Sequence, residues 1–275
     1  MSTQYLNLTE GKIAYDDQGA GPLVVCLPSM GDVRGEYRFL APRLVEAGYR
    51  VVTMDVRGHG ESSARWSDYT VGAWGSDIIA LIKHLNAGPA LVVGTSMGAA
   101  GAVYAAAEAP ELVSAIVLVG PFVRVMGPKW QALTMANLVA FPLWGVAFWG
   151  AYYRTLYPTA KPADFEGYVA NLKQNLKEPG RLAALRGMLS DLKTASDERL
   201  AKVEVPVHII MGSKDRDFKS PEKEVQNIVE RLTATRPTTQ IIPDAGHYPH
   251  AEMPEATAQS ILGFFSSINS TSKTK

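Results

Sequence analysis

The sequence predicts an α/β protein whose mostly parallel sheet is covered by helices on both faces. Short apolar runs rich in Val and Ile, each bounded by Gly, Pro or Asp, alternate with longer segments of helical periodicity. This alternation is typical of parallel strands connected by crossover helices. With 275 residues, the chain is long enough for one large domain with a sizeable core.

The order of the elements predicts a sheet of eight strands. The parallel strands are expected at residues 23–27, 51–54, 91–95, 115–119, 207–211 and 240–243, and the helices near 36–47, 71–86, 97–108, 221–234 and 254–267. Ahead of them, residues 4–8 and 13–16 flank Glu10 and Gly11 as the arms of a hairpin would. An antiparallel pair should therefore open the sheet.

The strand pattern is interrupted once, between Pro121 and Val205, where only helical and aromatic sequence occurs. So long an insertion between two strands is best explained as a helical cap, or lid, over the sheet. We expect a core built from residues 1–121 and 206–275 and a cap built from residues 122–205.

The segment from Trp130 to Tyr153 contains no charged side chain and is nominally long enough to cross a membrane. Because Pro142, Gly145 and Gly150 interrupt it, we interpret it as part of the cap and expect no stable membrane span.

Composition excludes several classes of partner. The 27 basic side chains balance the 27 acidic ones, which argues against nucleic acid. The single cysteine, Cys26, cannot form an internal disulfide, and the amino terminus lacks a basic region followed by an apolar run. We therefore expect a cytoplasmic location. No cluster has metal-ligand spacing, so neither a metal nor a cofactor is expected, and the sequence leaves the oligomeric state open.

A candidate nucleophile follows the strand expected at residues 91–95. Gly94-Thr95-Ser96-Met97-Gly98 matches Gly-x-Ser-x-Gly, a pattern that chance would produce in about one chain of this composition in eight. Its position between an apolar strand and a small-residue helix makes the match far more specific. A sharp turn there exposes the serine Oγ and aims backbone N–H groups and the positive end of the helix dipole at the site.

A serine hydroxyl needs a base to take its proton near neutral pH, and histidine is the usual one. Of the five histidines, His247 follows the last expected strand, on a loop that Gly246 allows to turn sharply. His250, three residues later, remains the alternative. His84 and His208 fall within a helix and a strand and are interpreted as structural.

The base in turn needs a carboxylate that fixes its tautomer. Asp215 and Asp217 both follow the strand expected at 207–211, and Asp215 is preferred because it is nearer the strand end. Asp244 is a third possibility that more simply forms a turn. The loop after the strand at 115–119 begins Gly-Pro-Phe and offers no carboxylate.

These segments resemble the α/β-hydrolase family over nearly the whole chain. The serine motif, Gly212-Ser213-Lys214-Asp215 and Ala245-Gly246-His247 fall where the family has its nucleophile, acid and histidine, in that chain order. Residues 54–62 resemble a structural loop of the family, so His59 is interpreted as not catalytic. The resemblance implies the α/β-hydrolase fold and a triad of Ser96, Asp215 and His247.

One departure from the family pattern concerns the loop after the third strand. Where many members have His-Gly, this chain has Pro28-Ser29-Met30-Gly31-Asp32. By position, the backbone N–H groups of Met30 and Met97 should form the oxyanion hole, since a backbone donor does not depend on the side chain.

The resemblance implies a serine hydrolase of the carboxylesterase type, which forms an acyl-enzyme without a cofactor. The aromatic cap would suit a small-molecule ester with a hydrophobic acyl or alcohol group, and the residues expected to line its pocket are Phe122, Met126, Trp130, Phe141, Trp144, Phe148 and Tyr152. The alternatives are a lactonase, a thioesterase, a C–C hydrolase of the meta-cleavage type and a peracid-forming side reaction. Outside catalysis, a small-molecule receptor or signalling module would use the same cleft.

Overall fold

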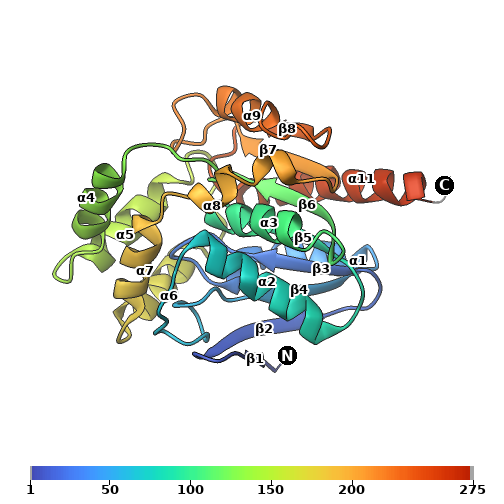
Figure 1. Ribbon diagram of the computed structural model, residues 1–275. Helices are drawn as coiled ribbons and strands as arrows, with labels where there is room; N and C mark the ends of the chain where they lie inside the picture. The colour runs from blue at the N-terminus through green and yellow to red at the C-terminus, as the bar shows by residue number, and fades with distance from the viewer. Residues whose placement is uncertain (1, 273–275) are drawn as a thin grey trace.

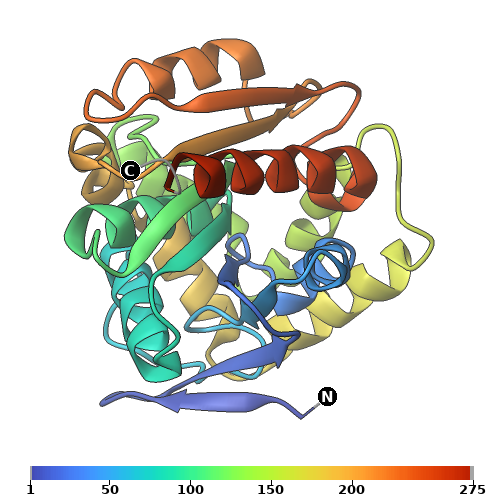
Figure 2. The same ribbon diagram turned by 90° about the vertical axis from the view of Figure 1, so that its right-hand side faces the viewer.

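The computed structural model describes residues 2–272, and its centre is one sheet of eight strands in the order β1-β2-β4-β3-β5-β6-β7-β8. β3 to β8 are parallel, and β2 pairs antiparallel with both β1 and β4. The predicted fold class and the opening hairpin are therefore confirmed. The strands are β1 Gln4–Asn7, β2 Lys12–Gln18, β3 Leu23–Leu27, β4 Arg50–Met54, β5 Ala90–Thr95, β6 Val113–Val119, β7 Val207–Gly212 and β8 Thr238–Ile242. Figure 2 shows β1 and β2 at one edge of the sheet and β8 at the other.

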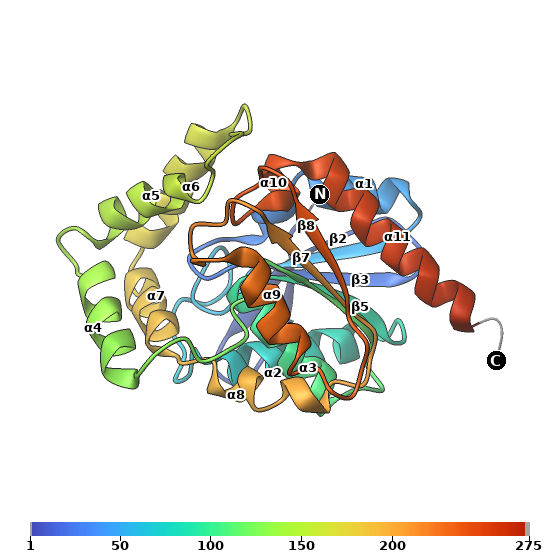
Figure 3. The ribbon, with the colours of Figure 1, turned by 90° about the horizontal axis from the view of Figure 1, so that it is seen from above.

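Two separate apolar layers hold the helices against the two faces of the sheet. Successive residues of a strand point to opposite faces, so Val25 belongs to one core and Cys26 to the other. The first layer packs α2 (Val71–Leu85), α3 (Met97–Glu108) and α9 (Pro221–Val229) on one face. The second packs α1 (Leu40–Glu46) and α11 (Pro254–Ser272) on the opposite face, as the view in Figure 3 shows.

Three helix bounds differ from the sequence prediction. The helix predicted at 36–47 is divided into η1 (Arg34–Tyr37) and α1, because Pro42 has no N–H to donate to a preceding turn and must lie in the first turn of a helix. The helix predicted at 221–234 ends at Val229, and turns connect it to β8. The last helix continues past residue 267 to Ser272.

Between β6 and β7 the described chain contains helices and no strand, as expected. Four of them gather at one end of the sheet (Figure 1), namely α4 (Lys129–Val139), α5 (Gly145–Thr155), α6 (Phe165–Lys177) and α7 (Arg181–Ser190). We propose that α4 to α7 form the cap. The following α8 (Thr194–Asp197) and η2 (Leu200–Lys202) pack on α3, so the proposed cap ends near residue 190 rather than at 205.

The charge-free segment that raised the question of a membrane span is divided between α4 and α5, with a turn at Pro142. Within residues 2–272, no helix is both long enough and apolar enough to cross a bilayer. The expectation about a span agrees with this finding.

The strand order creates a crevice where the site is expected. β3 lies between β4 and β5, so the connections that follow β3 and β5 leave the sheet in opposite directions. In open α/β sheets, ligands bind outside the carboxyl ends of strands at such a switch point. The loop with Met30 follows β3, and Ser96 follows β5.

Candidate active site

Ser96 occupies a strained turn between β5 and α3. Its backbone has φ 55° and ψ −118°. Residues other than glycine rarely adopt such a positive φ. Two glycines make the turn possible: a Cβ on Gly94 would lie 2.4 Å from the carbonyl oxygen of Gly98, and one on Gly98 would lie 2.6 Å from that of Leu27. The glycines therefore let α3 approach both β5 and the loop after β3.

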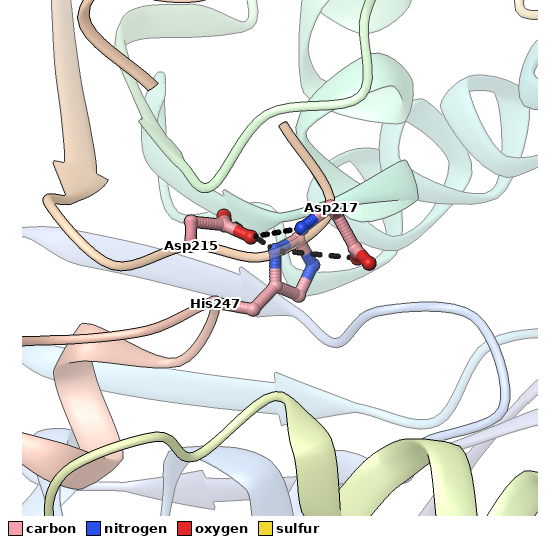
Figure 4. A group of neighbouring side chains, drawn as sticks. All are labelled: Asp215, Asp217 and His247. Carbon is pink, nitrogen blue, oxygen red and sulfur yellow. Dashed lines mark hydrogen bonds and ion pairs between the residues drawn. The ribbon is translucent and has the colours of Figure 1, made fainter. Parts of the chain in front are cut away.

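His247 and Asp215 are joined directly in the loops after β8 and β7 (Figure 4). The Nδ1–H of His247 donates to Asp215 Oδ2 at 2.7 Å, and both side chains are buried. Burial alone would lower the pKa of His247, but the nearby carboxylates, Asp215 foremost, outweigh it and raise the pKa to about 9. The bond to Nδ1 leaves Nε2 as the nitrogen available to a nucleophile.

Asp217 is a second carboxylate beside the same imidazole. Its Oδ2 lies 3.7 Å from His247 Nδ1, and its backbone N–H donates to Asp215 Oδ1 at 3.0 Å. The hydroxyl of Tyr152 in α5 donates to both of its carboxylate oxygens. One potential metal-ligand atom from each of Asp215, Asp217 and His247 lies within 4.8 Å of the other two. These side chains are, however, already hydrogen-bonded to each other or to Tyr152. We therefore propose that the cluster serves proton transfer.

The alternative base and the alternative acid, His250 and Asp244, lie outside this cluster. His250 is fully buried, its ring stacked on Tyr37 and its Nε2 3.1 Å from Glu36 Oε1 without hydrogen-bond geometry. Asp244 is exposed and forms an ion pair with Lys214 at the surface. Neither lines the cavity that contains Ser96, whereas His247 does, so the geometry favours His247 and its partner Asp215 as the sequence patterns did.

Ser96 and His247 share the wall of one small cavity. Its volume is about 30 Å³, and its other walls come from Met30 and Phe122, from Ser29, Tyr248 and Asp217, and from Trp149, Tyr152 and Leu156 of the cap region. No hydrogen bond joins Ser96 Oγ to His247 in residues 2–272. Such bonds are commonly long in ligand-free hydrolases and tighten when substrate binds.

Two backbone N–H groups next to this cavity have no hydrogen-bond partner. In the described part of the chain, the N–H groups of Met30 and Met97 make no hydrogen bond. Met97 is the first residue of α3, where N–H groups lack intrahelical acceptors and carry the positive end of the dipole. Met30 precedes Gly31 (φ 72°) in a turn closed by the N–H of Asp32 and the carbonyl of Ser29 at 3.2 Å. We propose that these two N–H groups form the oxyanion hole, which requires backbone donors that are not already paired.

Sequence reasoning missed a buried polar network that holds the Met30 loop. Glu36 Oε2 accepts from the N–H and the hydroxyl of Ser29 at 2.8 and 2.7 Å. The Ser29 hydroxyl also lies 2.7 Å from the hydroxyl of Tyr248, the residue next to His247. Ser29, a neighbour of Met30, is thus hydrogen-bonded to Tyr248, a neighbour of His247.

A second buried carboxylate, Asp32, ties this loop to the cap. It accepts hydrogen bonds from the hydroxyls of Tyr153 in α5 and Tyr168 in α6, and from the N–H of Val33. Burial, and then the charge of Glu36, raise the pKa of Asp32 despite these bonds. The only hint in the sequence is that two acidic residues, Asp32 and Glu36, occur in the segment after an apolar strand, which does not identify their partners.

A larger chamber of about 290 Å³ adjoins the small cavity, because Met30 and Phe122 line both. Met126, Met135, Leu189 and Leu192 make most of its remaining wall apolar. Its two basic side chains already have partners within the protein. Arg124 forms a two-pronged ion pair with Glu224, and the ammonium of Lys193 donates to two carbonyl groups at the end of α7.

The structure divides the seven side chains expected in the pocket wall. Phe122, Met126 and Tyr152 line one or both of the cavities. The other four line neither, because they lie on faces of α4 and α5 and the turn between them that nothing covers, and they are exposed: Trp130, Phe141, Trp144 and Phe148. The small cavity is also lined by Trp149 and Leu156, which are not among the seven expected residues because their apolar character did not distinguish them from the residues that prove to be exposed.

Comparison with known proteins agrees with this fold. Residues 24–260 match the model of the Alpha/beta hydrolase family, and the chain belongs to that family. It is 27% identical to the 2-(acetamidomethylene)succinate hydrolase of Mesorhizobium japonicum, over 90% of this chain and 89% of that protein.

Solved structures share the architecture. A thermophilic esterase from Thermogutta terrifontis superposes with a TM-score of 0.80 at 21% identity, covering 98% of this chain and 99% of that one. A bromoperoxidase from Bacillus anthracis gives 0.82 at 21% identity, covering 96% and 100%. Likeness at this identity establishes the shared fold.

Proposed function

We propose that the protein is a serine hydrolase of the carboxylesterase type, with Ser96 as nucleophile, His247 as base and Asp215 as the acid that orients it. The observation that carries the proposal is the strained turn at Ser96, whose side chain shares a cavity with a histidine bonded to a buried carboxylate. A cytoplasmic location is part of the proposal, favoured by the single buried cysteine.

The reaction follows from these positions. Ser96 Oγ attacks the ester carbonyl carbon while His247 Nε2 takes its proton, and the resulting oxyanion accepts hydrogen bonds from the N–H groups of Met30 and Met97. Collapse of this intermediate breaks the bond to the alcohol, which leaves with the proton from His247. A water molecule, deprotonated by the same histidine, then cleaves the acyl-enzyme and releases the acid.

The cavity walls favour a neutral, hydrophobic ester. The small cavity contains the carboxylate of Asp217 and neither Lys nor Arg, and the adjoining chamber is mostly apolar. The similar hydrolase from Mesorhizobium japonicum is named for a succinate, which carries two carboxylates. Such a substrate would meet repulsion from Asp217 here, so we propose an uncharged ester with its apolar group in the chamber.

The test is covalent labelling combined with turnover. A fluorophosphonate probe should modify Ser96, as located by mass spectrometry, and should leave Ser29, the other serine of the same cavity, unmodified. The native protein should release p-nitrophenol from short-chain esters, and Ser96→Ala should lose on the order of 10⁵-fold in kcat. Full activity in Ser96→Ala would refute the mechanism. Ligand-induced stabilisation without turnover in the native protein would instead indicate a binding module.

A further inference from the structure

The exposed apolar side chains of this protein are concentrated on one part of its surface. Of the large hydrophobic residues that are exposed in the described chain, all but Tyr5 lie between residues 125 and 148. Leu143 is 86% exposed and Trp130 69%. We call this the α4–α5 apolar surface and define it by Trp130, Leu138, Phe141, Leu143, Trp144 and Phe148.

The arrangement of α4 and α5 explains why these side chains are uncovered. α4 packs against α7 and α5, yet among its residues only Ala136 and Val139 are buried. Figure 1 and Figure 3 both show α4 at the outer end of the molecule, away from the sheet. Apolar residues on several sides of one helix cannot all face the protein, and the remainder are left in contact with solvent.

Contacts within the surface hold its aromatic side chains in place. Phe141 stacks on Trp144 with ring centroids 4.2 Å apart. The indole N–H of Trp144 donates to the carbonyl of Leu138 at 2.9 Å, which satisfies its polar group and leaves an apolar face outward. The surface is therefore formed before any partner arrives.

The surface carries no charge. No Asp, Glu, Lys or Arg occurs from residue 130 to 153. Protein surfaces normally intersperse charges, and an extended patch without them marks a site of contact with another apolar phase or protein. Contact with the six residues that define the surface is therefore apolar rather than ionic.

The surface is continuous with the way into the site. Met126 and Met135 are exposed beside it and also line the larger chamber, which reaches the cavity of Ser96 through Met30 and Phe122. A second copy of the chain seated here would cover this entrance. A lipid phase on the same face would itself be a source of hydrophobic molecules for this entrance.

We propose that the α4–α5 apolar surface docks on the surface of a lipid membrane, with its Trp, Phe and Leu side chains entering the acyl layer. On proteins that lie at the surface of a bilayer without spanning it, exposed Trp, Phe and Leu side chains enter the boundary between headgroups and acyl chains, and indole rings favour this depth. Docking does not depend on the proposed ester hydrolysis. Only the suggestion that the membrane supplies the substrate rests on that proposed function.

The experiment is sedimentation of the full-length chain with phosphatidylcholine vesicles. The protein should bind these uncharged vesicles equally at low and high salt, and Leu138→Glu/Leu143→Glu should weaken binding at least about tenfold while the melting temperature is kept. Tyr5→Glu, which alters an exposed aromatic residue outside the surface, should bind as the native protein does.

Three results would overturn the proposal: no binding to vesicles, binding only to anionic vesicles with loss at high salt, or a native dimer that the double variant dissociates. The last would identify the surface as an interface between copies. The readouts separate the two proposals, because Ser96→Ala should bind vesicles normally. The double variant should keep native turnover of a short soluble ester, whose cavity it does not touch.

Discussion

The hydroxyl of Tyr152 lies 2.7 and 2.8 Å from the two carboxylate oxygens of Asp217, and this bond connects a helix of the proposed cap to the candidate base. Asp217 in turn lies 3.7 Å from Nδ1 of His247. Burial, and then the charge of Asp217, raise the pKa of Tyr152 well above its usual value, so the phenol stays a donor. The position of α5 therefore affects how strongly Asp217 acts on the imidazole.

The raised pKa of His247, about 9, predicts an alkaline activity profile. Only the neutral imidazole can accept the serine proton, so kcat/KM for a soluble ester should rise at least about tenfold between pH 7 and 9, after correction for spontaneous hydrolysis. A plateau already reached at pH 7 would contradict this.

The same shift predicts the opposite trend for stability. The folded-state pKa lies above the usual value of 6.5, so the bound proton stabilises the fold fully below pH 6.5. This contribution is lost as the pH rises through about 9. Urea unfolding midpoints should fall between pH 7 and 9.5 in the native protein and fall less in His247→Gln, which has no imidazole to titrate.

Removing the charge of Asp217 should move the activity profile. Asp217→Asn keeps an acceptor for Tyr152 but removes a carboxylate that favours the imidazolium, so the acid limb of kcat/KM should shift down by about one pH unit. Tyr152→Phe is the matched control, because it deletes the hydrogen bond and leaves the charge. Its acid limb should not move downward. Identical shifts in the two variants would show that the effect is structural.

Local patterns predicted the sheet and the three candidate catalytic residues, because each lies directly beyond a strand whose apolar run is readable. Ser96, Asp215 and His247 need only the rule that parallel strands end at one edge. The hydrogen bonds from Tyr168 to Asp32 and from Tyr152 to Asp217 join residues far apart in the chain and depend on how the cap packs. No periodicity encodes that packing.

The cap also shows that sequence patterns do not predict how helices pack. Residues 130–153 contain no charged side chain, so composition predicted contact with substrate but could not select which face of α4 or α5 would be covered. Trp149 is buried at the cavity while Phe148, its neighbour, is exposed. Only the packing of the helices distinguishes the two.

Asp32 should be important for stability as well as for the shape of the site. Asp32→Ala leaves the hydroxyls of Tyr153 and Tyr168 buried without their acceptor and should lower the free energy of unfolding by about 3–5 kcal/mol. Asp32→Asn retains an acceptor and should cost clearly less. The measurement is urea denaturation near pH 7, and equal losses in the two variants would show that the hydrogen bonds are not what matters.

The close approach of α3 to the loop after β3 makes Gly98 sensitive to a single methyl group. Its Cβ would lie 2.6 Å from the carbonyl oxygens of both Leu27 and Pro28, so Gly98→Ala must push the helix from the Met30 loop and separate the two donors. We expect losses in both kcat and melting temperature. Gly167→Ala, at an open position of α6, should instead stabilise the protein by about 0.5–1 kcal/mol.

The oxyanion role of Met30 can be tested on its N–H alone. Met30 precedes Gly31 in the turn that Ser29 and Asp32 close, and proline suits that position while lacking the donor. Met30→Pro should therefore lower kcat about 10²- to 10³-fold with little change in KM, the cost of removing one donor to the oxyanion. Met30→Ala controls for the lost side chain, which lines both cavities, and should chiefly change KM. Because the proline ring cannot donate, equal kcat values in the two variants would exclude Met30 from the oxyanion hole, provided that circular dichroism and melting temperature show both variants to be folded.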